Sequence, residues 1–316
     1  MVINKRKFYV LLTALFLSVI AALRPFGFDR DYFNYLKRFI NSSFQINTRF
    51  EFGFEFITNI FKLVFGSETF VLFLFVLTFI ALITKFSILS RARNFPLMIV
   101  IYSMLILPLH EMMQIRVALA SGIIFYALFL SSSLELSFIK RILWVLTGIS
   151  MHYSVILLAP LVLFTELFKK RSLLLIILVL VLPSLFILLS IETLVKLDFL
   201  PMLAHYIQMS DSVNLFSSRV ITLVALILIG FWNKNYLPKN VLPWFYMSLL
   251  GIGLFFGLQS IAVLPQRLLE ITIFSYLVWV PYLPKISRII GFSLLIVFSA
   301  YFFYRAFYIS PFFTGG

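Results

Sequence analysis

The residues best suited to chemistry are a few ionisable side chains that border long apolar segments. Such groups are costly beside a bilayer and are functional candidates by default. Arginine presents a planar fork of donors that matches the oxygens of a diphosphate, and Arg116, Arg219 and Arg267 are the candidates for that role. Two simpler interpretations stay open, a snorkelling Arg116 at the membrane interface and an ion pair between Arg267 and Glu270 three residues later.

A second group of side chains is suited to taking the proton of a sugar hydroxyl. Carboxylates and neutral imidazoles are the usual general bases, and the candidates are Asp29, Asp31, His152 and Glu270. His152 also suits simple helix packing, and Asp31 suits the N-cap of a following helix. The side chains expected to contact sugar or phosphate are Gln114, Tyr153, His205 and Tyr206. For His205 and Tyr206, a polar surface loop is the alternative.

The chain lacks the motifs of soluble enzymes. It has no Gly-rich phosphate loop and no G-x-S-x-G, and the stretch that begins at His110 lacks the second histidine of a zinc protease motif. Cysteine is absent, which excludes disulfides, thiolate metal sites and a cysteine nucleophile. The three scattered histidines make a poor metal site. We therefore expect a function without a metal ion or cofactor.

Composition predicts a membrane protein. Hydrophobic residues make up 62% of the chain, charged residues only 12%, and the mean hydropathy is +1.06. The net charge of +14 lies in short basic clusters between apolar segments, which indicates membrane topology rather than nucleic-acid binding. Inside lipid the backbone polar groups must bond to one another, which favours helices as the spanning structure. We therefore expect an all-α, polytopic protein of about 9–11 transmembrane helices. The apolar segments are 8–23, 67–89, 95–109, 117–133, 142–168, 172–190, 220–232, 241–258, 268–283 and 289–308.

The basic clusters also predict a hairpin within segment 142–168. If that segment crossed the membrane once, all later clusters would lie on the wrong side, given a cytoplasmic N-terminus. Two short helices with a tip near His152-Tyr153-Ser154 restore the pattern. The cytoplasmic clusters are then Lys5-Arg6-Lys7, Arg91/Arg93, Lys140/Arg141, Lys169-Lys170-Arg171, Lys234/Lys239 and Lys285/Arg288.

The polar side chains gather on the outer face. Larger outer loops are expected at 24–66 and 191–219, with shorter ones at 110–116 and 259–267, in a single transmembrane domain (1–316) without a separate soluble domain. Ten of the twelve acidic residues lie on or beside these segments, all but Glu135 and Glu166. Two amphipathic patterns in the first loop predict helices that lie on the membrane surface. Their apolar residues are Tyr32, Phe33, Leu36, Phe39 and Ile40 in the first and Phe52, Phe56, Ile60, Phe61 and Val64 in the second.

The candidate residues, in their order, resemble the EpsG-like and Wzy-type polysaccharide polymerases of bacterial inner membranes. The resemblance lies in Asp31-Tyr32-Phe33-Asn34-Tyr35 after the first span, Gln114-Ile115-Arg116 followed by small residues, and His152-Tyr153-Ser154. These short motifs cover the first half of the chain. In the family pattern a Gly stands two residues before the acidic residue. Gly27 stands at this distance from Asp29 rather than from Asp31, so both acids remain candidates for the family's acidic position.

The resemblance implies a metal-independent membrane glycosyltransferase, for which a GT-C-like arrangement of spans is one expected form. Its substrates would be oligosaccharide repeat units linked to undecaprenyl diphosphate, which it would join into surface polysaccharide on the outer face of the inner membrane. Membrane lipids and a chain-length regulator protein are the candidate partners. Two alternatives stay open, a flippase or transporter of the same lipid-linked oligosaccharide and an O-antigen ligase-type transferase. Transporters often have internal repeats and polar residues at the bilayer midplane, and neither is evident here.

Overall fold

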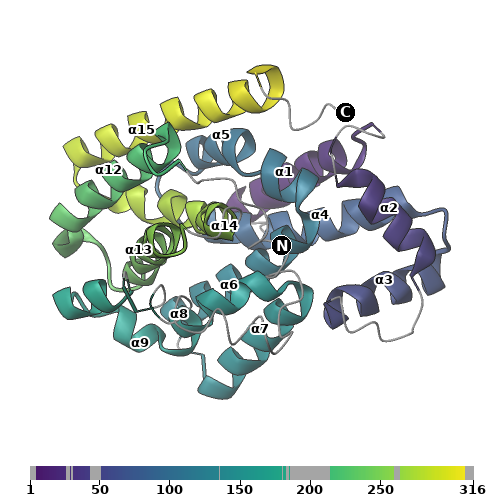
Figure 1. Cartoon of the computed structure of the whole chain (residues 1–316), viewed down its shortest axis with the longest axis horizontal. Helices are drawn as coiled ribbons and strands as arrows, with labels where there is room; N and C mark the ends of the chain where they lie inside the picture. Colours follow the sequence, from purple (N-terminus) through teal and green to yellow (C-terminus); the bar gives the residue numbers. More distant parts are fainter. Residues whose placement is uncertain are drawn as a thin grey trace. The chain divides into compact units, whose positions relative to one another are not determined.

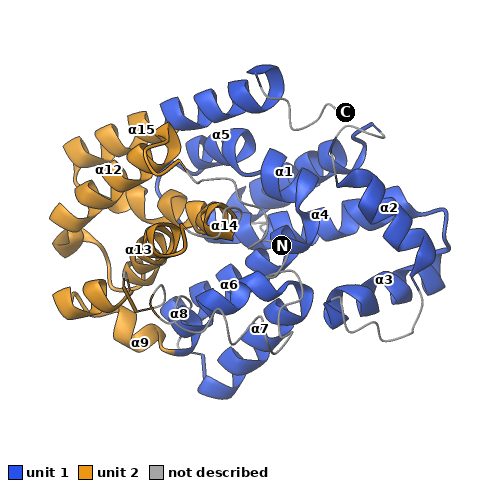
Figure 2. Cartoon of the chain, in the orientation of Figure 1, with its two compact units in different colours: residues 1–163, 296–316 blue, residues 164–295 orange. Residues whose placement is uncertain are grey.

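The computed structural model describes residues 5–25, 29, 31–42, 51–134, 136–179, 181–182, 185, 214–259 and 264–309. Regular structure in these ranges is entirely helical (Figure 1), which confirms the predicted all-α class. The chain divides into two compact units, shown in Figure 2. Unit 1 consists of Met1–Leu163 and Ile296–Gly316, and unit 2 is Phe164–Leu295.

Helix lengths agree with a multi-pass membrane protein. Three helices in the described ranges are long and apolar enough to cross a membrane: α4 (Phe70–Leu89), α6 (Ile115–Leu134) and α15 (Lys285–Tyr304), which η5 extends to Ile309. Shorter apolar helices accompany them, namely α5 (Phe95–Leu105), Tyr153–Leu163, α12 (Ser218–Trp232) and α13 (Leu242–Gly257). Each of these helices lies largely within one of the predicted apolar segments. Most of segment 172–190 and of loop 191–219 lies outside the described residues.

Unit 1 is built on a row of packed helices. Helix α1 (Lys5–Ala22) contacts α4, α4 contacts α6, and α6 contacts α7 (Phe138–Met151). Small residues allow the close approach: a Cβ atom added to Gly122 of α6 would lie 2.7 Å from Thr84 Oγ1 of α4. Close contact through small residues is the usual way in which helices associate inside lipid.

The predicted hairpin is present. Helix α7 ends at His152, whose backbone is extended (φ −161°, ψ 126°), and η2 (Tyr153–Leu158) and α8 (Ala159–Leu163) return against α7. Arg141 Nη1, near the start of α7, donates to the carbonyl oxygen of Leu163 over 3.2 Å. The two ends of the segment therefore lie side by side, and the break in the helix falls at His152.

The two helices predicted for the first outer loop are also present, as α2 (Tyr32–Asn41) and α3 (Phe52–Phe65). In α2, Phe33 and Ile40 of the predicted apolar face are exposed, while Tyr32 and Phe39 are buried together with Tyr35. The reason is aromatic packing: the rings of Tyr32 and Phe39 contact Phe70, at the start of α4. In α3 the apolar residues Phe52, Phe56 and Ile60 are exposed, as expected of a face that meets lipid.

Unit 2 centres on the pair formed by α13 and α14 (Leu264–Trp279). Gly251 of α13 has no room for a side chain, because an added Cβ would overlap Thr272 of α14. Ser248 Oγ of α13 accepts a hydrogen bond from Trp279 Nε1 over 2.7 Å and lies 3.0 Å from Ser275 Oγ. The polar groups buried between these two helices therefore bond to one another.

Candidate functional site

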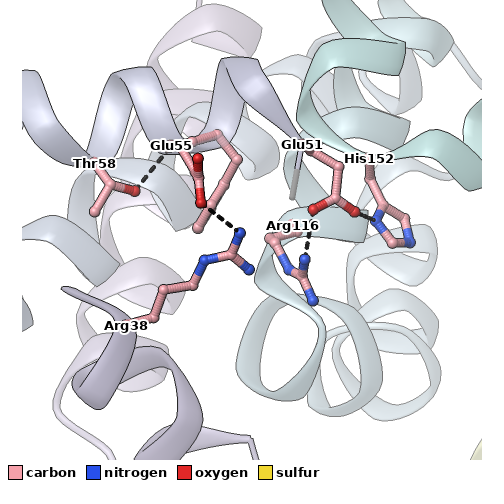
Figure 3. Close-up of polar contacts among 7 residues, drawn as sticks. Arg38, Glu51, Glu55, Thr58, Arg116 and His152 are labelled. Atoms are coloured by element: carbon pink, nitrogen blue, oxygen red, sulfur yellow. Dashed lines mark hydrogen bonds and ion pairs between the residues drawn. The ribbon is translucent and has the colours of Figure 1, made fainter. Parts of the chain in front are cut away.

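Three side chains from distant parts of unit 1 form a linear arrangement of hydrogen bonds (Figure 3). Arg116 Nη1 lies 2.6 Å from Glu51 Oε2, and Glu51 Oε1 lies 2.7 Å from His152 Nδ1. The carboxylate thus bridges a guanidinium and an imidazole. Two of the three residues, Arg116 and His152, are among the predicted site residues, and Glu51 was not predicted.

The local fold explains how these side chains meet. Glu51 occupies the N-cap position of α3, Arg116 is the second residue of α6, and His152 caps the C-terminus of α7. Gly53, in the first turn of α3, permits the contact with α7, because an added Cβ would overlap Ser150 Oγ. The start of α3 can therefore approach the end of α7, where His152 lies.

The carboxylate of Glu51 is ionised under all ordinary conditions. Burial raises the pKa of Glu51, but the hydrogen bond with His152 and the positive charge of Arg116 outweigh burial and lower this pKa to about 2. An ionised carboxylate only accepts hydrogen bonds, so a neutral His152 must donate its Nδ1–H to Glu51. Nε2 then carries the lone pair.

In this tautomer a neutral His152 has its Nε2 lone pair available to accept a proton. Its Nε2 has no hydrogen-bond partner among the residues that the structure describes. A carboxylate that fixes the tautomer of an imidazole through Nδ1 leaves Nε2 ready to take a proton, as in the histidine of serine hydrolases. The next residue, Tyr153, is 41% exposed and follows the helix break directly.

Arg116 is held between an acid and an aromatic ring. Its guanidinium carbon lies 5.9 Å from the centroid of the Tyr35 ring, in addition to the contact with Glu51. Its Nε is buried and has no hydrogen-bond partner within the described part of the chain. Gln114, also a predicted site residue, is the C-cap of η1 (Pro108–Met113), two residues before Arg116.

Asp29 and Asp31 lie together at the start of α2. Asp29 Oδ2 forms a buried ion pair with Arg24 Nε over 2.6 Å, and Asp29 Oδ1 accepts from the backbone N–H of Asp31 over 2.9 Å. Both carboxylate oxygens of Asp29 are therefore engaged within the chain, which favours a structural role. Asp31 occupies the N-cap position of α2, but its side chain makes no capping hydrogen bond.

The remaining predicted residues lie in unit 2 or outside the described ranges. In unit 2, Arg219 Nη1 of α12 contacts Glu270 Oε1 of α14 over 2.8 Å, and Arg267 lies one turn before Glu270. Glu270 thus pairs with Arg219, a partner that sequence spacing did not indicate, and the predicted Arg267–Glu270 pair stays a prediction. His205 and Tyr206 lie outside the described residues.

The segment predicted as the short outer loop 110–116 is mostly helical and buried. Residues Pro108–Met112 of η1 are buried, and Glu111 Oε1 lies 2.6 Å from Lys85 Nζ of α4, with both side chains fully buried. The hydroxyl of Tyr102 also donates to Glu111. Glu111 is buried because its charge is neutralised inside unit 1 by a lysine 26 residues earlier.

No group of three or more His, Asp or Glu residues in the described ranges is placed to hold a metal ion.

These features define a multi-pass, all-α membrane protein with an Arg–Glu–His arrangement at the ends of three helices. The chain belongs to the EpsG family, whose family model matches residues 7–314. The resemblance seen in the short motifs is therefore confirmed over nearly the whole chain. The EpsG family is associated with exopolysaccharide biosynthesis. Comparisons with curated proteins and with solved structures gave no match.

Proposed function

We propose that the protein polymerises oligosaccharide repeat units linked to undecaprenyl diphosphate, on the outer face of the bacterial inner membrane. The observation that carries this proposal is the Glu51 carboxylate, which contacts both His152 Nδ1 and Arg116 Nη1. His152, at one end of the arrangement, suits an acceptor hydroxyl, and Arg116, at the other end, suits a diphosphate. Glycosyl transfer from a lipid diphosphate needs these two groups together.

His152 serves as the general base in this proposal. Its Nε2 takes the proton of the acceptor hydroxyl as the hydroxyl oxygen forms a bond to the anomeric carbon of the donor sugar. Glu51 stabilises the imidazolium that results and holds the ring in place. Glu51 is thus a positioning residue, because it acts through His152 and Arg116 rather than on the sugar.

Arg116 stabilises the diphosphate leaving group in this proposal. The bond between the anomeric carbon and the diphosphate oxygen breaks, and its electron pair stays on that oxygen. A guanidinium fixed nearby stabilises the developing negative charge, and stabilisation of this kind is commonly the largest contribution to catalysis. Arg219 and Arg267 of unit 2 are further candidates for phosphate contacts, and Glu270, which contacts Arg219, is an alternative base.

The alternatives are a flippase for lipid-linked oligosaccharide and an O-antigen ligase-type transferase. A flippase needs cations to bind diphosphate but has no use for an imidazole with a fixed tautomer, so the Glu51–His152 contact favours group transfer. A ligase would use the same donor chemistry with another acceptor. A chain-length regulator remains the proposed protein partner.

Gel analysis of surface glycan in a strain that lacks the gene separates the three functions. Loss of a polymerase leaves single repeat units, loss of a ligase leaves no attached glycan, and loss of a flippase leaves no exported glycan. We expect single repeat units, and we expect wild-type protein but not His152→Gln to restore long chains. Glu68→Gln, which changes an exposed carboxylate of unit 1, is the matched control and should restore them. Restoration of long chains by His152→Gln would refute the assigned base.

A further inference from the structure

A second arginine lies beside the site. Arg38 of α2 contacts Glu55 of α3, with Nη2 3.4 Å from Oε1, and its guanidinium carbon lies 5.7 Å from the centroid of the Phe54 ring. Glu55 follows Glu51 by four residues, so the two acids share one face of α3. Figure 3 shows the side chains of Arg38 and Arg116 extending from separate helices toward this face of α3.

The two guanidinium groups repel one another. Burial and the positive charge of Arg116 lower the pKa of Arg38, whereas the carboxylates of Glu51 and Glu55 raise it. Two like charges in a partly buried site are unfavourable unless anions compensate them. Here the Glu51 carboxylate contacts both Arg116 and His152, and Glu55 is the carboxylate that contacts Arg38.

The ion pair between Arg38 and Glu55 is weaker than the ion pair between Arg116 and Glu51. Arg38 Nη2 lies 3.4 Å from Glu55 Oε1, whereas Arg116 Nη1 lies 2.6 Å from Glu51 Oε2. The side chains of Arg38 and Glu55 are also 18% and 20% exposed, and solvent weakens an ion pair that it reaches. Phosphate oxygens bind a guanidinium more strongly than that, because two parallel hydrogen bonds form. A diphosphate that entered between the two arginines would therefore displace Glu55 more easily than Glu51.

We propose that Arg38 and Arg116 are the two arms of one diphosphate-binding site, and that Glu55 is the resting counterion that the diphosphate displaces from Arg38. This inference rests on the proposed function and adds to it a second binding residue and an exchange of anions. The buried Nε of Arg116, which lacks a partner in the described part of the chain, supplies a further donor for the incoming phosphate. The α2 helix thereby becomes part of the substrate site rather than only a membrane-surface helix.

The test is calorimetric titration of the purified full-length protein with farnesyl diphosphate and, separately, with inorganic pyrophosphate. Arg38→Gln should weaken the binding of farnesyl diphosphate about 10- to 100-fold, because a charged hydrogen bond is lost. Glu55→Gln should tighten binding about two- to fivefold, because the competing anion is removed. Lys37→Gln removes an exposed charge from the neighbouring position of α2 and should change binding less than about twofold.

The outcomes distinguish this inference from the proposed function. If Arg38→Gln and Lys37→Gln both bind like the wild type while Arg116→Gln does not, the two-armed site is refuted and the role of Arg116 stands. If Arg116→Gln also binds normally, the donor site of the proposed function is refuted as well. Weaker binding by Glu55→Gln would refute the exchange of anions, even where Arg38→Gln is too unstable to purify. If pyrophosphate binds as tightly as farnesyl diphosphate, the site recognises the diphosphate group alone. If farnesyl diphosphate binds more tightly, the site recognises the headgroup of a lipid.

Discussion

Replacing Glu51 by glutamine removes the charge at the centre of the site while it keeps the size of the side chain. The pKa of Glu51 is lowered from 4.5 to about 2 in the folded protein, and a tenfold change in proton affinity corresponds to roughly 1.4 kcal/mol. The ionised carboxylate therefore stabilises the fold by about 3 kcal/mol at neutral pH. Since the folded pKa is the lower one, this stabilisation is complete above pH 4.5 and is lost as the pH falls toward 2.

The same substitution should also stop catalysis. A glutamine amide at this position can donate to His152 Nδ1 and so place the imidazole proton on Nε2, where the base is needed. We expect the polymerisation rate to fall by about 10²- to 10⁴-fold, the usual contribution of a general base. The binding of a lipid diphosphate should fall far less, because Arg116 and its charge remain.

Two measurements on purified Glu51→Gln protein check this reasoning. Thermal unfolding in detergent should show a loss of stability at pH 7 that shrinks as the pH falls below 4.5. Chain elongation on gels should be lost at a protein concentration at which the exposed Glu68→Gln variant elongates normally. A variant that polymerised at the wild-type rate would refute the role of Glu51 in orienting His152. A stability loss that did not depend on pH would refute its electrostatic origin.

Three further predictions concern topology, phosphate recognition and the buried pair. Since the chain has no cysteine, a cysteine at Tyr153 should react with an impermeant thiol reagent from outside and one at Ser172 should not; labelling of position 172 from outside would refute the hairpin topology. Arg116→Lys keeps the charge but loses the planar fork, so it should abolish long chains at normal protein abundance; long chains from Arg116→Ala would exclude the diphosphate role. Lys85→Met should destabilise the protein by about 3–5 kcal/mol, because Glu111 is left charged and buried, and Lys85→Met/Glu111→Gln should recover most of this loss. Thermal unfolding of the two variants measures the difference, and equal stability would argue against an ion pair.

The helical framework could be predicted from the sequence because lipid leaves the backbone few choices. Apolar runs such as 67–89 became helices such as α4. The hairpin could be predicted as well, because charge parity across the membrane required an even number of crossings in 142–168. The break at His152 has no local signal as strong as a proline; the count of basic clusters required a hairpin, and the polar residues His152-Tyr153-Ser154 indicated where its tip lies.

The partners of the site residues could not be predicted. Glu51 lies 65 residues from Arg116 and 101 residues from His152, and no periodic pattern relates positions so far apart. A local signal existed in Glu51 and Glu55, since carboxylates four residues apart at the start of an amphipathic helix lie on one face. The partner of Glu111 could not be predicted for a related reason: Lys85 lies inside an apolar run, where a single lysine does not alter the prediction of a span.

The buried Lys85–Glu111 pair also bears on how the protein is made. A lysine within a span opposes entry into lipid by about 2.5–3.5 kcal/mol on insertion scales, and its acid lies 26 residues further along the chain. During synthesis, α4 therefore leaves the ribosome before the residue that neutralises it. We expect this pair to form only after α5 and η1 have been made, so the lysine of α4 stays without its acid until the chain has extended to Glu111.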